Sequence, residues 1–246
     1  MKITAEILLV TVLAMTLVHS NLNLYSDHFA ESKVSPNQVK KWEVLFDGKD
    51  LAKWRKASVD SVPSKGWVVE NGTLSVLKGR KGGDIITRET YGDFELECEF
   101  KLNKGANSGI KYQVNSIQNA KTKKFSQMGI EYQIIDDKNH PEIMSDPDGV
   151  SSTGSAYLLY APKGKKLLPA GEWNKVGIIV KGNHVEHWLN GVKIVEYTRG
   201  SQDFLEKVAA TKFVDYPQYA KASGGHIMIT DHGDQVYFKN IRIRKL

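Results

Sequence analysis

Residues 94–100 read FELECEF, a stretch in which apolar and acidic side chains alternate without interruption. Successive side chains of a β-strand point to opposite faces, so Phe94, Leu96, Cys98 and Phe100 share one face and the glutamates share the other. The stretch therefore predicts a strand with one face in a core and the other in water. The chain's single cysteine lies on the core face, and a single cysteine excludes an intramolecular disulfide.

The same alternation continues on both sides of this strand. Two hairpins are predicted, at 67–76 and 185–197, because Asn71-Gly72 and Asn190-Gly191 tolerate the positive φ of a tight turn. Residues 175–182 extend the second hairpin to a three-stranded meander. Further strands are expected at 43–46, 84–88, 109–114, 129–136, 155–159, 226–230 and 235–244. The last strand changes phase near Asn240, which predicts a bulge there.

Helix is expected only at 201–210, with Ser201 as its N-cap. Many short strands with so little helix bury their apolar faces by stacking one sheet on another. The fold class is therefore all-β, a two-sheet antiparallel β-sandwich. The chain has 246 residues, is 41% hydrophobic and 25% charged, and has no linker-like stretch in its middle. Residues 41–246 are expected to form a single β-sandwich domain.

The first 20 residues have the layout of a secretory signal peptide. Lys2 precedes an apolar run at 7–18, and small Ser20 stands at a plausible cleavage point. The run is shorter than the ~20 residues of a spanning helix, although an uncleaved membrane tether is the alternative. We expect a signal peptide at 1–20, a polar leader at 21–40, and a periplasmic or secreted protein with no membrane span after cleavage.

The net charge of +6 comes from basic residues that are scattered among acids. The short clusters KTKK (121–124) and KGKK (163–166) are typical of solvated loops, and no basic stripe with interleaved aromatic residues accompanies them. Nucleic acid is therefore not an expected partner.

One predicted strand has a polar face that a core would not need. Residues 129–137 read GIEYQIIDD, which places Glu131 and Gln133 on one face and Tyr132 and Ile134 on the other. On the predicted strand 109–114, Lys111 likewise lies on a polar face. On 185–190, His187 shares a parity with Val185 and Leu189. We expect these polar positions to line a concave sheet face that holds a ligand.

Five blocks of the sequence resemble one family. The blocks are EVLFDGKDLAKWR (43–55), GDFELECEFKLNKGANSGIKY (92–112), GIEYQIIDDKNHPE (129–142), AGEWNKVGIIVKGNHVEHWLNGVKIVEY (170–197) and GGHIMITDHGDQVYFKNIRIRKL (224–246). Together they are similar to the 3-keto-disaccharide hydrolase domain family over most of 42–246. The resemblance implies a concanavalin A-like jelly roll related to laminarinase-type glucanases, and extracytoplasmic carbohydrate chemistry in bacteria. Relatives often carry Gln where this chain has Thr230.

The resemblance implies cleavage of 3-keto-glycosides or 3-keto-disaccharides. A ketone at C3 acidifies the proton on C2, so a base, an electrophilic stabiliser and an acid for the leaving oxygen can break the bond to C1 by elimination, and water can then add. The matching blocks offer Glu131 as base, Lys111 as stabiliser, and His140 or His187 as acid. The residues expected to bind substrate are Gln133, Asp136, His187, Tyr157, Thr230 and His232.

Each candidate has a structural alternative. Glu131 can form a salt bridge with Lys111 across the sheet, and Asp136 can end its strand as a turn residue. His140 can be a solvated loop residue, and Tyr157 can pack in the core. His232 follows a strand end, where a turn is as good an interpretation as a ligand contact.

No cofactor is firmly indicated. The candidate ligands for a divalent metal are His140, Glu142, Asp146 and Asp148, but their spacing matches neither an EF-hand nor an HExxH motif. The Gly-rich stretch KGRKGGD (78–84) lacks both the P-loop and the G-x-G-x-x-G order. A separate sugar 3-dehydrogenase is therefore expected to produce the keto substrate.

Two other functions fit the same residues. A non-catalytic carbohydrate-binding module uses a similar polar and aromatic inventory on a β-sandwich, and fold alone does not decide function. A conventional laminarinase-like glucanase needs two carboxylates on one strand. Gln133 stands where the second one would be expected, so this alternative ranks last.

Overall fold

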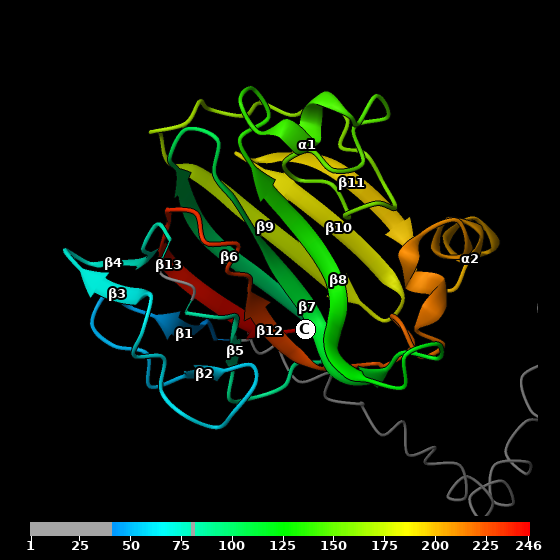
Figure 1. Ribbon diagram of the computed structural model, residues 1–246, viewed down its shortest axis with the longest axis horizontal. Coiled ribbons are helices and arrows are strands. Elements are labelled where there is room, and N and C mark those ends of the chain that lie inside the picture. Colours follow the sequence, from blue (N-terminus) through cyan, green and yellow to red (C-terminus); the bar gives the residue numbers. More distant parts are fainter. Residues whose placement is uncertain (1–40, 80–81) are drawn as a thin grey trace, which may run out of the picture. The chain divides into compact units, whose positions relative to one another are not determined.

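The structure is a computed structural model, and it describes residues 41–79 and 82–246 (Figure 1). The predicted signal peptide and polar leader lie outside the described residues. The described part consists of two antiparallel sheets, with short helical segments outside them (Figure 1). The prediction of an all-β sandwich with little helix is confirmed.

The larger sheet has eight strands in the order β11-β10-β9-β6-β13-β4-β3, with β1 paired to β13. Its strands are β1 (Glu43–Phe46), β3 (Trp67–Glu70), β4 (Thr73–Val76), β6 (Phe94–Leu102), β9 (Asn174–Lys181), β10 (His184–Leu189), β11 (Val192–Thr198) and β13 (Val236–Lys245). Both predicted hairpins, β3-β4 and β10-β11, and the β9-β10-β11 meander lie in this sheet. The bulge predicted near Asn240 is also present, because the register of β13 against β6 shifts between Lys239 and Arg242.

The smaller sheet has five strands in the order β2-β5-β12-β7-β8. They are β2 (Trp54–Lys56), β5 (Ile85–Thr87), β7 (Asn107–Gln118), β8 (Phe125–Ile135) and β12 (His226–Ile229). The helical segments are α1 (Pro141–Met144), α2 (Gln202–Ala209) and the 3-10 turn η1 (Lys212–Asp215). In α2, the Ser201 hydroxyl accepts a hydrogen bond from Phe204 N at 3.2 Å, so the predicted cap is confirmed.

The core lies between the two sheets, and β6 contributes alternate side chains to it. Phe94, Leu96, Cys98 and Phe100 are each at most 2% exposed, as their alternation predicts. On the outer face of the same strand the glutamates form ion pairs with basic side chains of neighbouring strands, as Glu97 does with Arg242. Burial raises the pKa of the Cys98 thiol, which fits a packing residue and not a nucleophile.

The smaller sheet contributes Ile110, Tyr112, Ile130 and Tyr132 to the core. Because alternate residues face opposite ways, Lys111 on β7 and Glu131 on β8 must point away from the core. The sheet pairing that buries the aromatic residues therefore also sets the polar face predicted from the sequence.

Candidate functional site

The polar face is built on the pairing of β7 with β8. Lys111 is the register partner of Glu131, and Gly109 is the partner of Gln133. Lys111 Nζ lies 3.6 Å from Glu131 Oε2, and the two side chains are 22% and 9% exposed. The ion pair is therefore mostly shielded from water, and Lys111 is the more exposed of its two members.

The neighbouring strand adds Thr230, which directly follows β12. Its backbone N donates a hydrogen bond to Gly109 O at 3.0 Å, and its hydroxyl lies 3.3 Å from Glu131 Oε1. Gln133 and Thr230 are only 2% and 1% exposed. The floor of the candidate site thus combines a carboxylate, an ammonium, an amide and a hydroxyl on one side of the smaller sheet.

A segment of turns, residues 153–157 (the strip 153–157), lies along the free edge of β8. Gln133 N donates to Ser155 O at 3.2 Å, Gly154 N donates to Gln133 O at 2.8 Å, and Tyr157 N donates to Glu131 O at 3.0 Å. The strand predicted at 155–159 is therefore present only as this strip, in which Ala156 forms an isolated bridge with Tyr132. Burial and the charge of Glu131 both raise the pKa of Tyr157, so the phenol lies near Glu131, while the residue also packs against the core.

Tyr157 connects the strip to the loop that carries His140. Its hydroxyl donates to Glu142 Oε1 at 2.8 Å, and the ammonium of Lys212 lies 4.9 Å from the centre of its ring. Burial raises the pKa of Tyr157, and the hydrogen bond to Glu142 and the charges of Glu142 and Glu131 raise it further. The phenol therefore remains protonated at neutral pH and acts as a donor.

His140 caps α1 with one ring nitrogen. Its Nδ1 accepts a hydrogen bond from Glu142 N at 3.2 Å. In a neutral imidazole the other nitrogen then carries the proton, so Nε2 can donate. Tyr157 N bonds Glu131 O and the Tyr157 hydroxyl bonds Glu142, so this loop is joined to the backbone of β8. Of the hydrogen bonds and ion pairs between described residues, none joins the side chain of His140 to that of Glu131.

Asp136 is held by hydrogen bonds to its own turn and to Gly105, and the substrate contact expected for it stays a prediction. Its carboxylate accepts hydrogen bonds from Gly105 N, Asn139 Nδ2 and Lys138 N at 2.8, 2.7 and 3.1 Å. Burial alone would raise the pKa of Asp136, but these hydrogen bonds outweigh it and hold the pKa below its usual range. The structure shows the turn residue that was the alternative interpretation.

The expectation that His187 contacts substrate or protonates the leaving group does not fit its position. His187 is fully buried between the sheets, where Nε2 lies 2.9 Å from Tyr112 Oη and Nδ1 lies 2.9 Å from Gly154 O. Burial lowers the pKa of His187 to about 4, although the bond to Gly154 acts in the opposite direction. The core face of β10 carries Val185 and Leu189 as well, so the parity that includes His187 faces inward.

His232 is exposed in the loop after β12. The neighbouring Asp231 organises this loop, because its Oδ2 accepts hydrogen bonds from Gly82 N and Gly83 N at 2.6 and 2.8 Å. Among the described residues no hydrogen bond or ion pair joins His232 to Glu131, so the structure does not bring this candidate onto the polar face.

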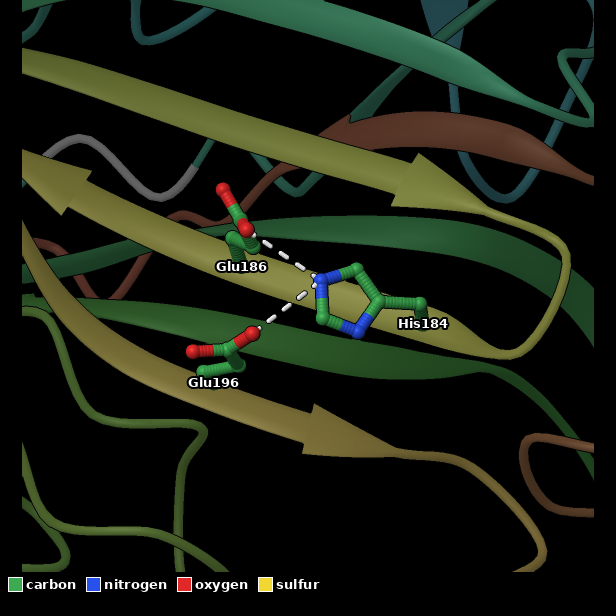
Figure 2. A group of neighbouring side chains, drawn as sticks. All are labelled: His184, Glu186 and Glu196. Atoms are coloured by element: carbon green, nitrogen blue, oxygen red, sulfur yellow. Dashed lines mark hydrogen bonds and ion pairs between the residues drawn. The ribbon is translucent and has the colours of Figure 1, made fainter.

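The candidate metal ligands His140, Glu142, Asp146 and Asp148 do not gather in the part of the chain that the structure describes. Asp146 instead accepts hydrogen bonds from Val150 N and Ser151 N. In the described residues, 41–79 and 82–246, three side chains of ligand type do lie close together. They are His184, Glu186 and Glu196, on the outer face of β10 and β11 (Figure 2). Figure 2 shows His184 Nε2 directed at both carboxylates, at 3.2 and 3.4 Å.

That outer group already holds a cation. Lys193 Nζ lies 3.3 Å from Glu186 Oε1 and 2.6 Å from Glu196 Oε2. A cross-strand ion network of this kind needs no metal. The group also lies on the larger sheet, whereas Glu131 belongs to the smaller one.

The larger sheet also carries a hollow of about 490 Å³ on its outer side. Its lining residues include Glu97, Lys175 and Arg242, and the Glu97 carboxylate forms ion pairs with both Lys175 and Arg242. In this hollow Glu97, Lys175 and Arg242 neutralise one another. The Glu131 face, where the base and the cation lie beside an amide and a hydroxyl, is therefore the stronger candidate.

Two features of the site had no signal in the sequence pattern. Lys212 reaches Tyr157 from a distant segment, and Gly109 faces Glu131 across the strand pair. Strand alternation finds the face of a residue, but it does not find its neighbours on the next strand. The register pairs Gly109 with Gln133, so Gly109 is the diagonal neighbour of Glu131, and only the register of β7 against β8 identifies it.

Three comparisons agree with this structure. Residues 41–244 match the profile of a family described as the 3-keto-alpha-glucoside-1,2-lyase-like domain. A 3-keto-disaccharide hydrolase of Bacteroides thetaiotaomicron is 32% identical in an alignment of 226 positions, which covers 82% of this chain and 77% of the relative. A solved structure from Parabacteroides distasonis, assigned as a glycosyl hydrolase, is 33% identical with a TM-score of 0.71 over 83% of this chain and 94% of the other.

A more distant solved structure shares the fold alone. It is a Bacillus subtilis protein with a galectin-like fold, 12% identical with a TM-score of 0.50 over 83% of this chain and 94% of the other. The two-sheet sandwich is thus found with very different sequences, so the fold by itself decides no activity.

Proposed function

Because the chain belongs to the family of 3-keto-alpha-glucoside-1,2-lyase-like domains, it is a glycoside-cleaving enzyme, and we propose that it cleaves 3-keto-glycosides by removing the proton on C2. The relative from Bacteroides thetaiotaomicron is a 3-keto-disaccharide hydrolase, which supports a keto disaccharide as the substrate class.

The separation of Glu131 and Lys111 is the observation that supports this chemistry best. In a 3-keto sugar the acidic hydrogen is on C2 and the oxygen that becomes negative is on C3, the neighbouring carbon. A base and a cation that serve the two atoms must therefore lie side by side. Glu131 Oε2 and Lys111 Nζ, 3.6 Å apart, satisfy this requirement.

The proposed reaction proceeds in two steps. Glu131 takes the C2 proton, and the electron pair of that C–H bond forms an enolate whose oxygen Lys111 stabilises. The enolate then re-forms the C3 ketone and a C1–C2 double bond, and the bond from C1 to the leaving oxygen breaks. The leaving oxygen takes up a proton from water, and His140 Nε2–H can donate a hydrogen bond to that oxygen because Nδ1 is held as an acceptor by Glu142 N.

Water then completes a hydrolysis. It adds to C1, and C2 receives a proton, so the 3-keto sugar is released with a free hydroxyl at C1. Without this addition the same residues would give a lyase product. Gln133 is suited to hold a sugar hydroxyl in either case, because an amide can donate and accept but is no base at neutral pH.

The wider setting of the enzyme is part of the proposal. The signal-like layout of residues 1–20 supports a periplasmic or secreted protein. N-terminal sequencing of the native protein checks this, since an intact Met1 would contradict it. A sugar 3-dehydrogenase acting earlier would supply the ketone. Among the residues that the structure describes, no helix has the length and apolar content needed to cross a membrane.

The experiment compares a 3-keto disaccharide with its unoxidised parent, each with and without a chelator, and measures released sugar. Release from the keto compound alone is expected. Release from both compounds would favour the conventional glucanase, and release from neither would favour the carbohydrate-binding module. Loss of activity with chelator, restored by a divalent ion, would identify a metal requirement.

A further inference from the structure

We propose that Gly109 and Thr230 are positioning residues that aim the Glu131 carboxylate, an inference that rests on the proposed role of Glu131 as the base. Glu131 projects from the middle of a strand, and a free carboxylate there could adopt several orientations. The surrounding strands restrict it from three sides.

The first restriction is the absence of a side chain at Gly109. A Cβ at this position would lie 2.1 Å from Glu131 Oε1 and 2.9 Å from both Cγ and Cδ of Glu131. The carboxylate therefore lies directly over the bare backbone of β7. The φ of Gly109 is outside the left-handed region, so the backbone itself does not require glycine here. The space above Gly109 is what only a glycine can provide.

The second restriction is the hydroxyl of Thr230. Gly109 O already accepts the backbone N–H of Thr230 at 3.0 Å, and the hydroxyl lies 3.4 Å from that oxygen and 3.3 Å from Glu131 Oε1. The better use of its single proton is therefore a hydrogen bond to the carboxylate. Thr230 is 1% exposed and its hydroxyl faces the carboxylate, so it is placed to hold Glu131, and its expected contact with a sugar stays a prediction.

The third restriction is Lys111, which contacts the other oxygen. Oε1 faces Thr230 and Gly109, whereas Oε2 faces Lys111 at 3.6 Å. Different neighbours at the two oxygens fix the rotation of the carboxylate about its last bond. A base that must reach one hydrogen of a bound sugar gains rate from such fixed geometry.

The test of Gly109 is Gly109→Ala. The three atoms that the new Cβ would meet first all belong to the Glu131 side chain, so the fold should survive while the carboxylate turns away. We expect kcat for a 3-keto disaccharide to fall about 10- to 100-fold with little change in KM. Gly177→Ala is the matched control, because Gly177 is a strand glycine of the larger sheet whose Cβ would lie 3.1 Å from Trp188 Cβ. It should keep kcat.

The test of Thr230 is a pair of variants. Thr230→Val keeps the shape and loses the donor, and it should lower kcat about 10-fold, the value of one hydrogen bond. Thr230→Ser keeps the donor and should stay within about 3-fold of the wild type. If the methyl group of Thr230 mattered and its hydroxyl did not, serine would not restore kcat.

Crystal structures of Gly109→Ala and Thr230→Val separate this inference from the proposed function. A displaced Glu131 carboxylate supports positioning even if the wild type does not cleave keto sugars, which would overturn only the proposed function. Wild-type kcat in both variants, or a carboxylate that keeps its position in both, would overturn the positioning role.

Discussion

Lys111 is the residue at which the catalytic and the structural interpretation of the polar face differ most. A cross-strand ion pair would explain its contact with Glu131 without any chemistry. An enolate stabiliser must in addition place its charge where the C3 oxygen of the substrate will lie. Substitution of Lys111 can separate the two interpretations, because the free energy of unfolding reports on the ion pair and kcat reports on enolate stabilisation.

Lys111→Met should lower kcat about 10²- to 10³-fold, the usual cost of losing an oxyanion donor. The free energy of unfolding should fall by about 1–2 kcal/mol, because the partly shielded Glu131 carboxylate loses its partner. Kinetics and urea denaturation of the same preparations measure both effects.

Lys111→Arg is the control for that variant. It retains the positive charge and should restore stability, but its longer, planar head displaces the charge, so kcat should remain low. An arginine variant with full activity would show that any positive charge near Glu131 is sufficient, and a methionine variant with normal kcat would leave only the ion pair.

The strip 153–157 is the element that closes the edge of β8, and Gly154 determines whether it can lie there. Gly154 has a φ of +90°, and a Cβ would lie 2.2 Å from Ile194 Cδ1. Its carbonyl accepts from His187, and its N–H donates to Gln133 O. The backbone conformation therefore favours glycine, and any Cβ would force the Ile194 side chain to move.

Gly154→Ala should lower the free energy of unfolding by about 3 kcal/mol, from backbone strain and overpacking together. It should also lower activity, because the strip carries Tyr157. Gly164→Ala is the matched control, since Gly164 has a φ of +64° but no atom within 4 Å of its Cβ. It should cost only the strain, about 1 kcal/mol. Equal losses in urea denaturation would contradict the steric explanation.

At the level of strands, the sequence could predict most of the fold because alternation is a local property. The alternation in FELECEF predicts which side chains of β6 face the core, and the two Asn-Gly pairs predict the hairpin turns. Neither prediction requires knowing which strands pair with one another. The strip 153–157 was harder to predict, because its contacts with β8 depend on a loop and on Gly154. Its short apolar run resembles a strand.

The error at His187 shows how a single polar residue can mislead. Val185 and Leu189 share its parity and are fully buried, so the strand pattern taken as a whole predicts the core face. The outer face of β10 carries the half-buried side chains of His184, Glu186 and Trp188. Likewise, the face of Glu131 follows from the sequence, whereas the contacts with Gly109 and Thr230 depend on the pairing of three strands.

For the whole molecule, His187 links the two sheets and gives stability a pH dependence. Its pKa of about 4 in the folded protein lies below the ordinary value of 6.5. Between these values the unfolded chain binds a proton that the folded protein does not. The free energy of unfolding should therefore fall as the pH drops from 6.5 to 4, by about 3 kcal/mol from this group, and reach its full value above 6.5.

His187→Gln checks this assignment. Glutamine can still hydrogen-bond in the core but does not titrate, so the variant should lose that part of the slope even if it is less stable throughout. Urea denaturation at several pH values between 4 and 7 measures the slope for both proteins. An unchanged slope in the variant would assign the pH dependence to other groups.

The reaction of the whole enzyme is tested most directly by cleaving a 3-keto disaccharide in D₂O and locating deuterium in the released sugar by mass spectrometry. An incubation without enzyme corrects for spontaneous exchange. The account predicts deuterium at C2 with the wild type, and a loss of about 10²- to 10⁴-fold in the rates of release and incorporation with Glu131→Gln. Release without deuterium at C2, or near-normal release by Glu131→Gln, would contradict it.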